Sequence, residues 1–414
     1  PACGSGGMFV SSADFIEQYG INANIAMTFY GQEKVDYNAK LCVMNMAVHG
    51  LDAKIISGDE ANSFYNDYHN LAGCCDYVMA NPPFNVDKVK SETALNAGRL
   101  PFGLPSVNKN KEIGNANYLW ISYFYAYLNK NGRAGFVMAS SATDSQSKDK
   151  DIREQLVKTG DVDVMLSVRN NFFYTKSLPC SLWFFDKAKK EENKDKVLFI
   201  DARNYYTVVD RTLNEWSEWQ MKNLNAIVWL YRGETDKYKN LIKEYIRYFK
   251  TCKKYIVGKD ARRVFSDIEG IEDFEDMKYA LISEIEYEKQ ECKEKLEKAE
   301  KKDKKHIQTM SDQYISILEK DIKVLDEAQW LTEKFGYGKY DDIPGLCKIA
   351  TRADIEAKNY SLTPGAYVGV AEAEDDGVDF NERMKEIHKE LIELQTESDK
   401  LMNSVSKNWE ELGL

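Results

Sequence analysis

Short apolar runs and longer amphipathic stretches take turns along the first half of the chain. Apolar runs of about four to eight residues are typical of buried strands, whereas apolar residues spaced three and four apart predict helices. Strands are predicted at Ile25–Tyr30, Lys54–Ser57, Asp76–Ala80, Gly135–Ala139, Asp163–Val168, Cys180–Phe185 and Val197–Ile200. Strands that alternate with helices indicate an α/β fold with a mainly parallel sheet, and the closely spaced last strands indicate an antiparallel edge.

Two helices and one loop are predicted between these strands. The first helix spans Val35–Val48, and we expect it to bury Leu41, Met44 and Val48 on one face. The second spans Asn117–Leu128. Its aromatic residues are Tyr118, Trp120, Tyr123, Phe124 and Tyr127. Such an aromatic stripe belongs more often to a hydrophobic core than to a platform on which bases stack, so we predict that these residues are buried in the core. Residues 85–116 are polar and rich in turn residues, which predicts an irregular, mobile loop beside the site.

The second half of the chain is predicted to be mainly helical. Residues 213–345 follow helical spacing, and residues 282–328 are so dense in Glu and Lys that we predict a charged helical arm or hairpin. We therefore expect three regions, at 1–211, 212–345 and 346–414.

The last predicted helix covers residues 380–412 and carries a narrow apolar seam. The seam consists of Met384, Ile387, Leu391, Leu394, Leu401 and Val405. A strip this narrow predicts that another helix covers it. The charged arm of this chain and a separate partner are both open as the covering helix.

The charge of the chain limits how it can bind nucleic acid. The net charge is −11 over 414 residues, of which residues 1–210 contribute −2 and the remainder −9. Lys and Arg neutralise phosphates, so we expect the chain alone to bind DNA weakly and a partner to supply much of the affinity.

The cysteines and the apolar runs exclude several classes of protein. Eight cysteines are scattered without a CxxC pair, and there are only four histidines. This pattern argues against a zinc ribbon or a disulfide framework and is typical of a reducing cytoplasm. No apolar run reaches the length of a membrane span, and no secretory signal is visible. We expect a cytoplasmic protein with no metal site and no membrane partner.

The stretch with the clearest chemical meaning is Asn81-Pro82-Pro83-Phe84, directly after a predicted strand. Proline has no N–H to donate to a ladder, so the two prolines end the strand and stiffen the turn. Ligands bind at the carboxyl ends of strands in open α/β sheets. A carboxamide, a rigid carbonyl and an aromatic ring at this place suit one task, holding a planar base by its exocyclic amine. An ordinary strand-to-loop stop is the alternative for this stretch alone.

The first residues of the chain are typical of a cofactor loop. Residues 1–9 read PACGSGGMF, and a helix is predicted directly after the glycines. Glycines let the backbone approach a ligand closely, and a glycine loop that opens a helix cradles cofactors in Rossmann-like sheets. Glu33 and Asp59 follow the next two predicted strands, where carboxylates can bind the ribose hydroxyls and the adenine amine of a nucleoside. An ordinary tight turn and two solvated loop carboxylates are the alternatives.

These motifs, in this order on successive strand ends, resemble the amino-group DNA methyltransferases that use S-adenosylmethionine. More narrowly, the chain is similar to the modification subunits of type I restriction-modification systems. Two further segments carry that similarity, namely Asn171–Tyr174 with Ser177–Pro179, and Asn359–Tyr367. The resemblance implies a Rossmann-like S-adenosylmethionine-dependent methyltransferase sheet followed by a mainly helical C-terminal region.

The resemblance also implies the reaction and the site residues. The methyl group would pass from S-adenosylmethionine to N6 of an adenine flipped out of duplex DNA; cytosine N4, and an amine or amide in protein or RNA, stay open as targets. The implied cofactor-binding residues are Pro1, Ala2, Cys3, Gly4, Ser5, Gly6, Gly7, Glu33, Asp59 and Asn81. The implied catalytic residues are Asn81 and Pro82, which accept hydrogen bonds from the target amine, Pro83, which stiffens the turn, and Phe84, which stacks on the base.

The same resemblance implies partners and shows one departure from the family pattern. A specificity subunit would choose the DNA sequence, with two modification subunits for each, and a restriction subunit would complete the complex in a bacterial cytoplasm. Family members carry an aspartate before the position of Pro1, at the end of the first sheet strand, and a helical N-terminal domain. We therefore expect a C-terminal fragment of such a subunit, with a non-catalytic assembly subunit as the alternative for this form.

Overall fold

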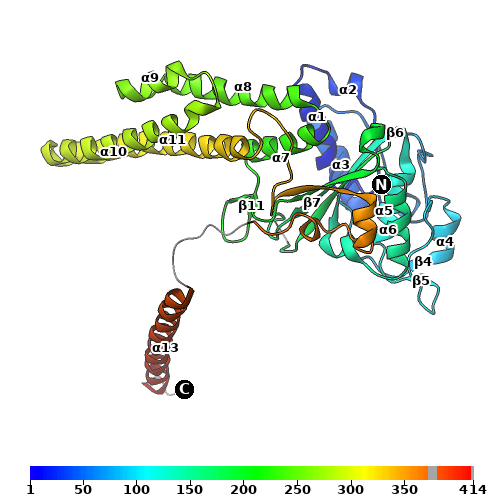
Figure 1. Ribbon diagram of the computed structural model, residues 1–414. Helices are drawn as coiled ribbons and strands as arrows, with labels where there is room; N and C mark the ends of the chain where they lie inside the picture. The colour runs from blue at the N-terminus through cyan, green and yellow to red at the C-terminus, as the bar shows by residue number, and fades with distance from the viewer. Residues whose placement is uncertain (175, 372–379, 412–414) are drawn as a thin grey trace. The chain divides into compact units, whose positions relative to one another are not determined.

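The computed structural model describes residues 1–174, 176–371 and 380–411, which belong to two compact units, Pro1–Val370 and Ala371–Leu414. The first unit contains a six-stranded sheet and a separate pair of parallel strands, β1 and β2 (Figure 1). A mainly helical region follows the sheet along the chain. The predicted α/β fold with a helical C-terminal region is confirmed.

The six-stranded sheet has the order β12-β9-β7-β8-β6-β3. The bounds in chain order are β3 (Cys75–Ala80), β6 (Leu128–Ala139), β7 (Val162–Val168), β8 (Cys180–Asp186), β9 (Lys196–Asp201) and β12 (Cys347–Thr351). β3, β6, β7 and β9 point the same way, while β8 runs antiparallel between β6 and β7. The predicted place of the antiparallel strand is therefore wrong, because β8 lies inside the sheet. The antiparallel edge strand is β12, which pairs with β9 from about 150 residues earlier.

The two-stranded parallel sheet consists of β1 (Phe29–Glu33) and β2 (Ala53–Ser57). It packs with α1 (Gly7–Glu17), α2 (Ala23–Ala26) and α3 (Asp36–Val48) around a small apolar cluster. The predicted strand Ile25–Tyr30 is wrong in its first half. The Asn22 side chain accepts a hydrogen bond from the Ile25 N–H and caps the short helix α2, so the strand begins only at Phe29.

The start of helix α3 lies within one residue of its predicted position, but the predicted buried face of the helix is wrong. Met44 and Val48 are exposed, and the buried side chains are Ala39, Cys42 and Met46. Small side chains allow α1 and the glycine loop to come close to this helix: a Cβ placed on Gly6 would lie 2.7 Å from Sγ of Cys42.

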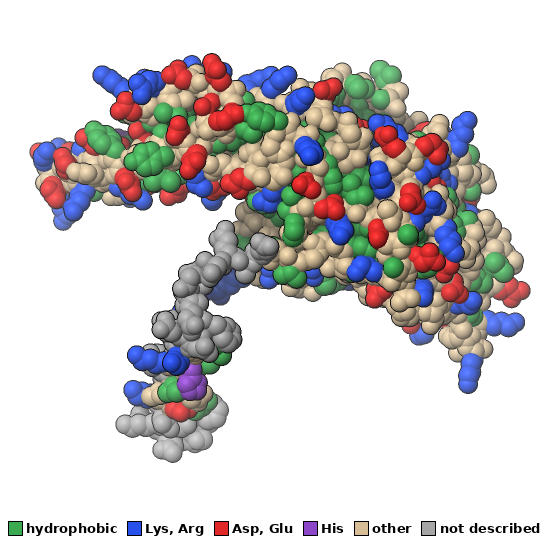
Figure 2. Space-filling model, viewed as in Figure 1, with side chains coloured by type: hydrophobic (Ala, Val, Ile, Leu, Met, Phe, Trp, Pro, Cys, Tyr) green, Lys and Arg blue, Asp and Glu red, His purple; other side chains and the backbone are tan. Residues whose placement is uncertain are grey.

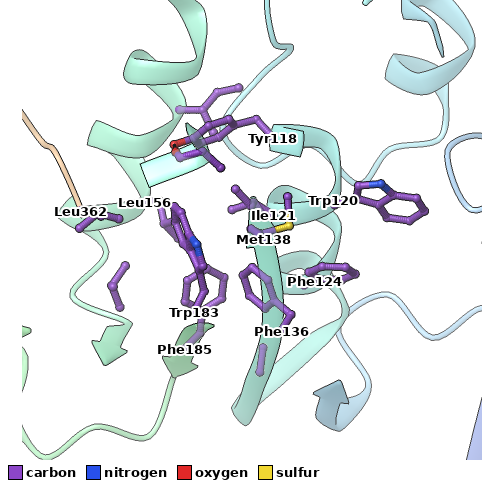
Figure 3. Close-up of a cluster of buried hydrophobic side chains, with 14 of the residues drawn as sticks. Tyr118, Trp120, Ile121, Phe124, Phe136, Met138, Leu156, Trp183, Phe185 and Leu362 are labelled. Carbon is purple, nitrogen blue, oxygen red and sulfur yellow. Dashed lines mark hydrogen bonds between the residues drawn. The ribbon is translucent and has the colours of Figure 1, made fainter. Parts of the chain in front are cut away.

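Strand residues of alternating orientation build a separate hydrophobic cluster on each face of the six-stranded sheet. The first face packs against α5 (Asn117–Tyr127), α6 (Lys148–Lys158) and α12 (Arg352–Ala357). Figure 3 shows this cluster, in which the rings of Phe136 and Trp183 stack with centroids 6.0 Å apart. All five aromatic residues singled out on α5 are buried there, as predicted.

The second face of the sheet packs against the helical region. Its helices are α7 (Glu218–Tyr231), α8 (Thr235–Cys252), α9 (Lys259–Asp267), α10 (Phe274–Lys298) and α11 (Lys301–Phe335). α10 and α11 pack against each other as a long hairpin, and Figure 2 shows charged side chains along its surface. The predicted charged helical arm is confirmed. A short antiparallel pair, β10 (Thr207–Val208) and β11 (Asn214–Glu215), precedes α7.

Residues 85–116 are more regular than predicted. They contain β4 (Val89–Lys90), α4 (Ser91–Asn96) and β5 (Glu112–Ile113), and β4 pairs with β5. Val89, Phe102 and Ile113 are buried in the first hydrophobic cluster. These few apolar side chains fix the segment on the core, although its composition is that of a loop.

The second unit contains α13 (Phe380–Glu411), which agrees with the predicted last helix. The side chains of the apolar seam are exposed along it, between 36% for Ile387 and 61% for Leu394 and Leu401. Within the described parts of the chain, no helix is both long enough and apolar enough to cross a membrane.

Candidate active site

Asn81 follows the last residue of β3 and has a free carboxamide. Ala80 ends the strand in parallel register with Phe136 of β6. Pro82 is buried, whereas Asn81 is exposed, and its side chain makes no hydrogen bond to any described residue. The turn is therefore anchored by the buried Pro82, while the side-chain amide of Asn81 faces solvent.

Three asparagines fix the turn that follows Phe84. The Asn85 N–H donates to Oδ1 of Asn117 at 2.9 Å, and Oδ1 of Asn85 accepts from the side-chain amides of Asn115 and Asn117, both at 2.9 Å. Asn85 has φ +56°, a left-handed conformation that asparagine tolerates better than most residues. Asn117 is buried at the start of α5. These bonds attach the proline turn to the start of the core helix α5, and no sequence pattern predicted them.

A pocket of about 520 Å³ opens beside this turn. Its volume lies within the range of roughly 300–1,000 Å³ that is typical of small-molecule sites. Three segments line it: residues 81–85 after β3, residues 139–141 at the end of β6, and four residues from the segment between β7 and β8, namely Phe173, Lys176, Leu178 and Pro179. Asn81, Pro82, Pro83 and Phe84 all line this pocket, so the structure brings the four predicted catalytic residues together.

None of the other residues of this pocket was predicted as a site residue. Phe173, Leu178 and Pro179 belong to segments that carried the family resemblance, but Ser140, Ser141 and Lys176 were not singled out. Ser140 directly follows β6, just as Asn81 follows β3. The strand-end rule that drew attention to Asn81 would have found Ser140 as well.

The glycine loop is attached to the end of β1. The Cys3 N–H donates to the Gln32 carbonyl at 3.1 Å, and the Gly4 N–H donates to Oε2 of Glu33 at 3.0 Å. Gly6 has φ +80° and is the residue directly before α1. A side chain at Gly6 would be strained by this conformation and would also meet the Cys42 thiol, so glycine is required there.

The outer side of the loop has room for a ligand. A Cβ on Gly4 or Gly7 would meet no atom within 4 Å, and the Ser5 N–H donates no hydrogen bond to a described residue. A hydrogen bond with the Cys42 thiol, together with burial, raises the pKa of Cys3, so this thiol stays uncharged at neutral pH. The loop thus offers free backbone N–H groups at a helix N-terminus beside an uncharged thiol.

A second cavity, of about 1320 Å³, joins the glycine loop to Asn81. It is lined by Pro1, Ala2, Cys3, Gly4, Ser5 and Gly7 of the loop, by Asn81, and by residues of β1 and β3. Much of this volume extends between β1 and β3, which make no strand pairing with each other in the described residues, so only part of it belongs to the loop. Of the residues that the structure describes, Asn81 is the one that lines both this cavity and the pocket beside the proline turn.

The two predicted carboxylates differ in how they relate to this cavity. Glu33 does not line it but is hydrogen-bonded to Gly4, which does. Asp59 is exposed at the start of a short 3₁₀ turn after β2 and lines neither cavity. Among the residues that the structure describes, no three Asp, Glu, His or Cys side chains are grouped so that they could hold a metal ion.

Known proteins match this chain along its whole length. The profile of a family described as N-6 DNA Methylase matches residues 1–260. The MjaIX methylase subunit of a type I restriction enzyme from Methanocaldococcus jannaschii is 30% identical over all of this chain and 55% of its own length. The HindI methylase subunit from Haemophilus influenzae is 27% identical over all of this chain and 68% of its own length.

A solved structure shows the same fold. The methyltransferase subunit of a type I restriction-modification system from Streptococcus thermophilus aligns with a TM-score of 0.53 at 15% identity, over 89% of this chain and 53% of that one. The chain thus spans about half the length of that subunit and of the MjaIX subunit. Because the profile covers the glycine loop, the proline turn and the six-stranded sheet apart from β12, the chain belongs to the N-6 DNA methylase family.

Proposed function

We propose that this chain carries the catalytic site of a type I modification subunit, which transfers a methyl group from S-adenosylmethionine to N6 of adenine in duplex DNA. The observation that supports this most directly is the position of Asn81. It is shared by the cavity of the glycine loop and by the pocket of the proline turn. A methyl donor and an acceptor base that occupy the two spaces would meet at this one side chain.

The residues around the first cavity fit the proposed cofactor. The methionine carboxylate is an anion, and free N–H groups at the start of α1 suit it. Each oxygen of Glu33 accepts one backbone hydrogen bond, from Gly4 or from Val35, and keeps a second lone pair for a ribose hydroxyl. Asp59 remains our proposal for the adenine amine. Bound here, S-adenosylmethionine would supply an electrophilic methyl group on a sulfonium centre.

The residues around the second pocket fit a flipped base. The exocyclic amine of adenine is a poor nucleophile, because its lone pair is delocalised into the ring. Hydrogen bonds from the amine to Oδ1 of Asn81 and to the Pro82 carbonyl favour a pyramidal nitrogen and aim its lone pair. Neither acceptor needs to be a strong base, since the proton can leave after methyl transfer. Orientation within a desolvated site does most of the work.

The aromatic rings of this pocket would hold the base. Phe84 and Phe173 come from different strand ends and both line the pocket. A base inside a duplex cannot reach the cofactor, so it must be extruded and stacked on such rings. Pro83 restricts the backbone of the turn, so that Asn81 and Phe84 keep a fixed position relative to each other.

The charge and α13 support the proposed partners. A chain with a net charge of −11 needs help to hold DNA, which a specificity subunit would give. The exposed seam of α13 is the surface we propose for that contact, with two modification subunits for each specificity subunit and a restriction subunit in the full bacterial complex. The proposed functional regions remain residues 1–211, 212–345 and 346–414. The strand β12 belongs to the third of these regions but pairs within the six-stranded sheet of the first.

The test is methylation by the complete protein, as its gene encodes it, assembled with its specificity subunit. Duplex DNA, RNA and protein are incubated separately with methyl-labelled S-adenosylmethionine, and the DNA is digested to nucleosides. We expect the label in N6-methyladenine. Label in N4-methylcytosine would change the target base, and label in protein or RNA alone would overturn the proposal.

A further inference from the structure

The loop after β6 lines the pocket of the proline turn and is fixed through its backbone. This loop is the 3₁₀ turn η2 (Ser140–Asp144). The Ala142 carbonyl accepts a hydrogen bond of 2.6 Å from the Tyr118 hydroxyl, and the Ser140 carbonyl accepts one of 2.8 Å from Oγ1 of Thr143. Just after the turn, the Ser145 carbonyl accepts one of 2.8 Å from Arg153, whose side chain is fully buried. The backbone of this loop is therefore rigid.

Part of that rigidity comes from a segment more than 200 residues later in the chain. The Leu362 N–H donates to the Thr143 carbonyl at 2.8 Å, and the hydroxyls of Thr143 and Thr363 lie 2.6 Å apart. Nε of Arg153 donates to the Tyr360 carbonyl. Figure 3 shows Leu362 among the side chains of the buried cluster, to which Leu156 also belongs. The segment is thus anchored in the core and holds η2 from outside.

Three polar side chains of this pocket are unpaired, two from this loop and one, Lys176, from the segment between β7 and β8. The hydroxyls of Ser140 and Ser141 make no hydrogen bond to any described residue, and Nζ of Lys176 has no carboxylate partner among them. Among the described residues, no Asp or Glu lines the pocket, in a chain whose net charge is −11. Two free hydroxyl donors and one ammonium group make this the electropositive end of an otherwise neutral pocket.

The serines lie beyond Asn81 along the sheet. Ala80 pairs with Phe136, so the position beside Asn81 on β6 is Val137, and Ser140 is three residues further on. At about 3.3 Å per strand residue this is roughly 10 Å. A nucleotide whose base amine is held at Asn81 would therefore bring its opposite end, the sugar and phosphate, toward the serines and Lys176.

We propose that Ser140, Ser141 and Lys176 bind the phosphate of the flipped target nucleotide, and that Thr363 is a positioning residue that holds the two serines through Thr143. This inference rests on the proposed function. Phosphate oxygens accept hydrogen bonds from hydroxyl and ammonium donors. A rigid loop keeps the donors in place before DNA arrives, so little ordering is needed on binding.

The test uses three variants in the complete protein assembled with its specificity subunit: Lys176→Gln, Ser140→Ala with Ser141→Ala, and Thr363→Val. Since a hydrogen bond to a charged group is worth more than one between neutral groups, we expect each of the first two to raise the KM for DNA about tenfold while kcat at saturating DNA changes little. Lys176→Gln should also lower the slope of log affinity against log salt by about 1. Lys130→Gln, an exposed lysine at the opposite end of β6, is the matched control.

Thr363→Val separates positioning from folding. It should raise the KM for DNA, lower the fluorescence of 2-aminopurine placed at the target position, and add nothing when combined with the serine pair. Thr363→Ser keeps the hydroxyl and should restore normal values. Thr332→Val, whose hydroxyl bonds only within α11, is the control for loss of a threonine hydroxyl.

Two results would overturn the inference. The first would be that the KM for DNA of both Lys176→Gln and the serine pair equals that of Lys130→Gln, and that the salt slope of Lys176→Gln also equals that of Lys130→Gln. The other is a Thr363→Ser variant as impaired as Thr363→Val. Asn81→Ala in the same assay separates failure of the phosphate site from failure of the proposed function. If Asn81→Ala abolishes methylation while the phosphate variants are normal, only the phosphate site is wrong. If Asn81→Ala is also normal, the proposed function itself is wrong.

Discussion

The carboxylate of Glu33 accepts a hydrogen bond of 3.0 Å from the backbone N–H of Gly4, 29 residues earlier in the chain. Its other oxygen accepts one, also of 3.0 Å, from the N–H of Val35. Glu33 therefore ties the glycine loop to the end of β1 and to the segment that leads into α3. In this position a single side chain can shape the loop and contact a ribose that lies on it.

Glu33→Ala should weaken S-adenosylmethionine binding at least tenfold. The variant loses a charge-assisted contact to the ribose, of about 1.5–3 kcal/mol, and releases the Gly4 N–H. Calorimetry on the complete protein measures the dissociation constant. Glu17→Ala, at the exposed end of α1, is the control and should bind normally. A dissociation constant for Glu33→Ala within twofold of the parent would remove Glu33 from the site.

Gly6→Ala should also impair the loop, for two separable reasons. Gly6 has φ +80°, which costs an L-residue about 1–2 kcal/mol, and an added Cβ would lie 2.7 Å from Sγ of Cys42. Combining it with Cys42→Ala removes the contact but not the backbone strain. We therefore expect the double variant to recover part of the lost cofactor affinity and thermal stability. Full recovery would show that the backbone conformation is not strained, and no recovery would show that the contact is harmless.

Much of the sheet could be predicted because local pattern decides it. The apolar runs at 76–80 and 163–168 lie within one residue of β3 and β7, and the aromatic residues of α5 are core because a strongly apolar helix has to be buried. β12 was not predicted. Its residues Cys347–Thr351 become a strand through pairing with β9, far away in the sequence.

The missed parts of the site depend on contacts between distant residues. Asn85, Asn115 and Asn117 look like ordinary turn residues, and only their meeting around the proline turn gives them a role. The buried face of α3 was misjudged for a related reason. The spacing of large apolar residues predicts that Met44 and Val48 are buried. The glycine loop comes so close to α3 that the smaller side chain of Cys42 is buried there instead.

Lys189 should make folding stability depend on pH above neutrality. Burial lowers the pKa of Lys189 to about 8 from its usual value of 10.5, although Asp163 lies 3.8 Å away. Between these two values the unfolded state binds more protons, so this lysine makes the folded state more stable as the pH rises, by about 3 kcal/mol in all. Below pH 8 the cost of the buried charge is fully present, and above pH 10.5 it is gone.

Urea unfolding from pH 7 to pH 10.5 measures this effect. The stability of the parent relative to Lys189→Met should rise across that window, because methionine does not titrate. Lys190→Met removes a neighbouring lysine that is 64% exposed and should show no such trend. A difference between parent and Lys189→Met that stays constant with pH would mean that Lys189 titrates normally.

The seam of α13 should be needed for assembly and not for folding. Leu391 and Leu394 are 59% and 61% exposed, and burying a leucine is worth about 1.5–3 kcal/mol. Leu391→Asp with Leu394→Asp should therefore abolish co-purification with the specificity subunit and leave the melting temperature of the isolated chain unchanged. Lys389→Asp with Thr396→Asp places charges away from the seam and should assemble normally. A large drop in the melting temperature would instead place the seam inside this chain.

Asn81→Ala should lower methyl transfer by roughly 10²–10³-fold at saturating DNA and cofactor, the scale of one lost hydrogen-bonding group that acts in the transition state. The reason is geometric. The Asn81 carboxamide has no protein partner in the described structure, and Asn81 lines both cavities. Its removal therefore takes away the proposed acceptor of the target amine and leaves the turn fixed by Asn85 and Pro82.

Asn81→Asp keeps an acceptor oxygen at the same place and should retain much more activity than Asn81→Ala. Single-turnover rates of methyl transfer compare the three proteins, and calorimetry checks that S-adenosylmethionine still binds each of them. If orientation of the amine is the task of Asn81, the rate must follow the presence of the acceptor oxygen and not the affinity for the cofactor. Near-normal turnover by the alanine variant would exclude Asn81 as the residue that aims the amine.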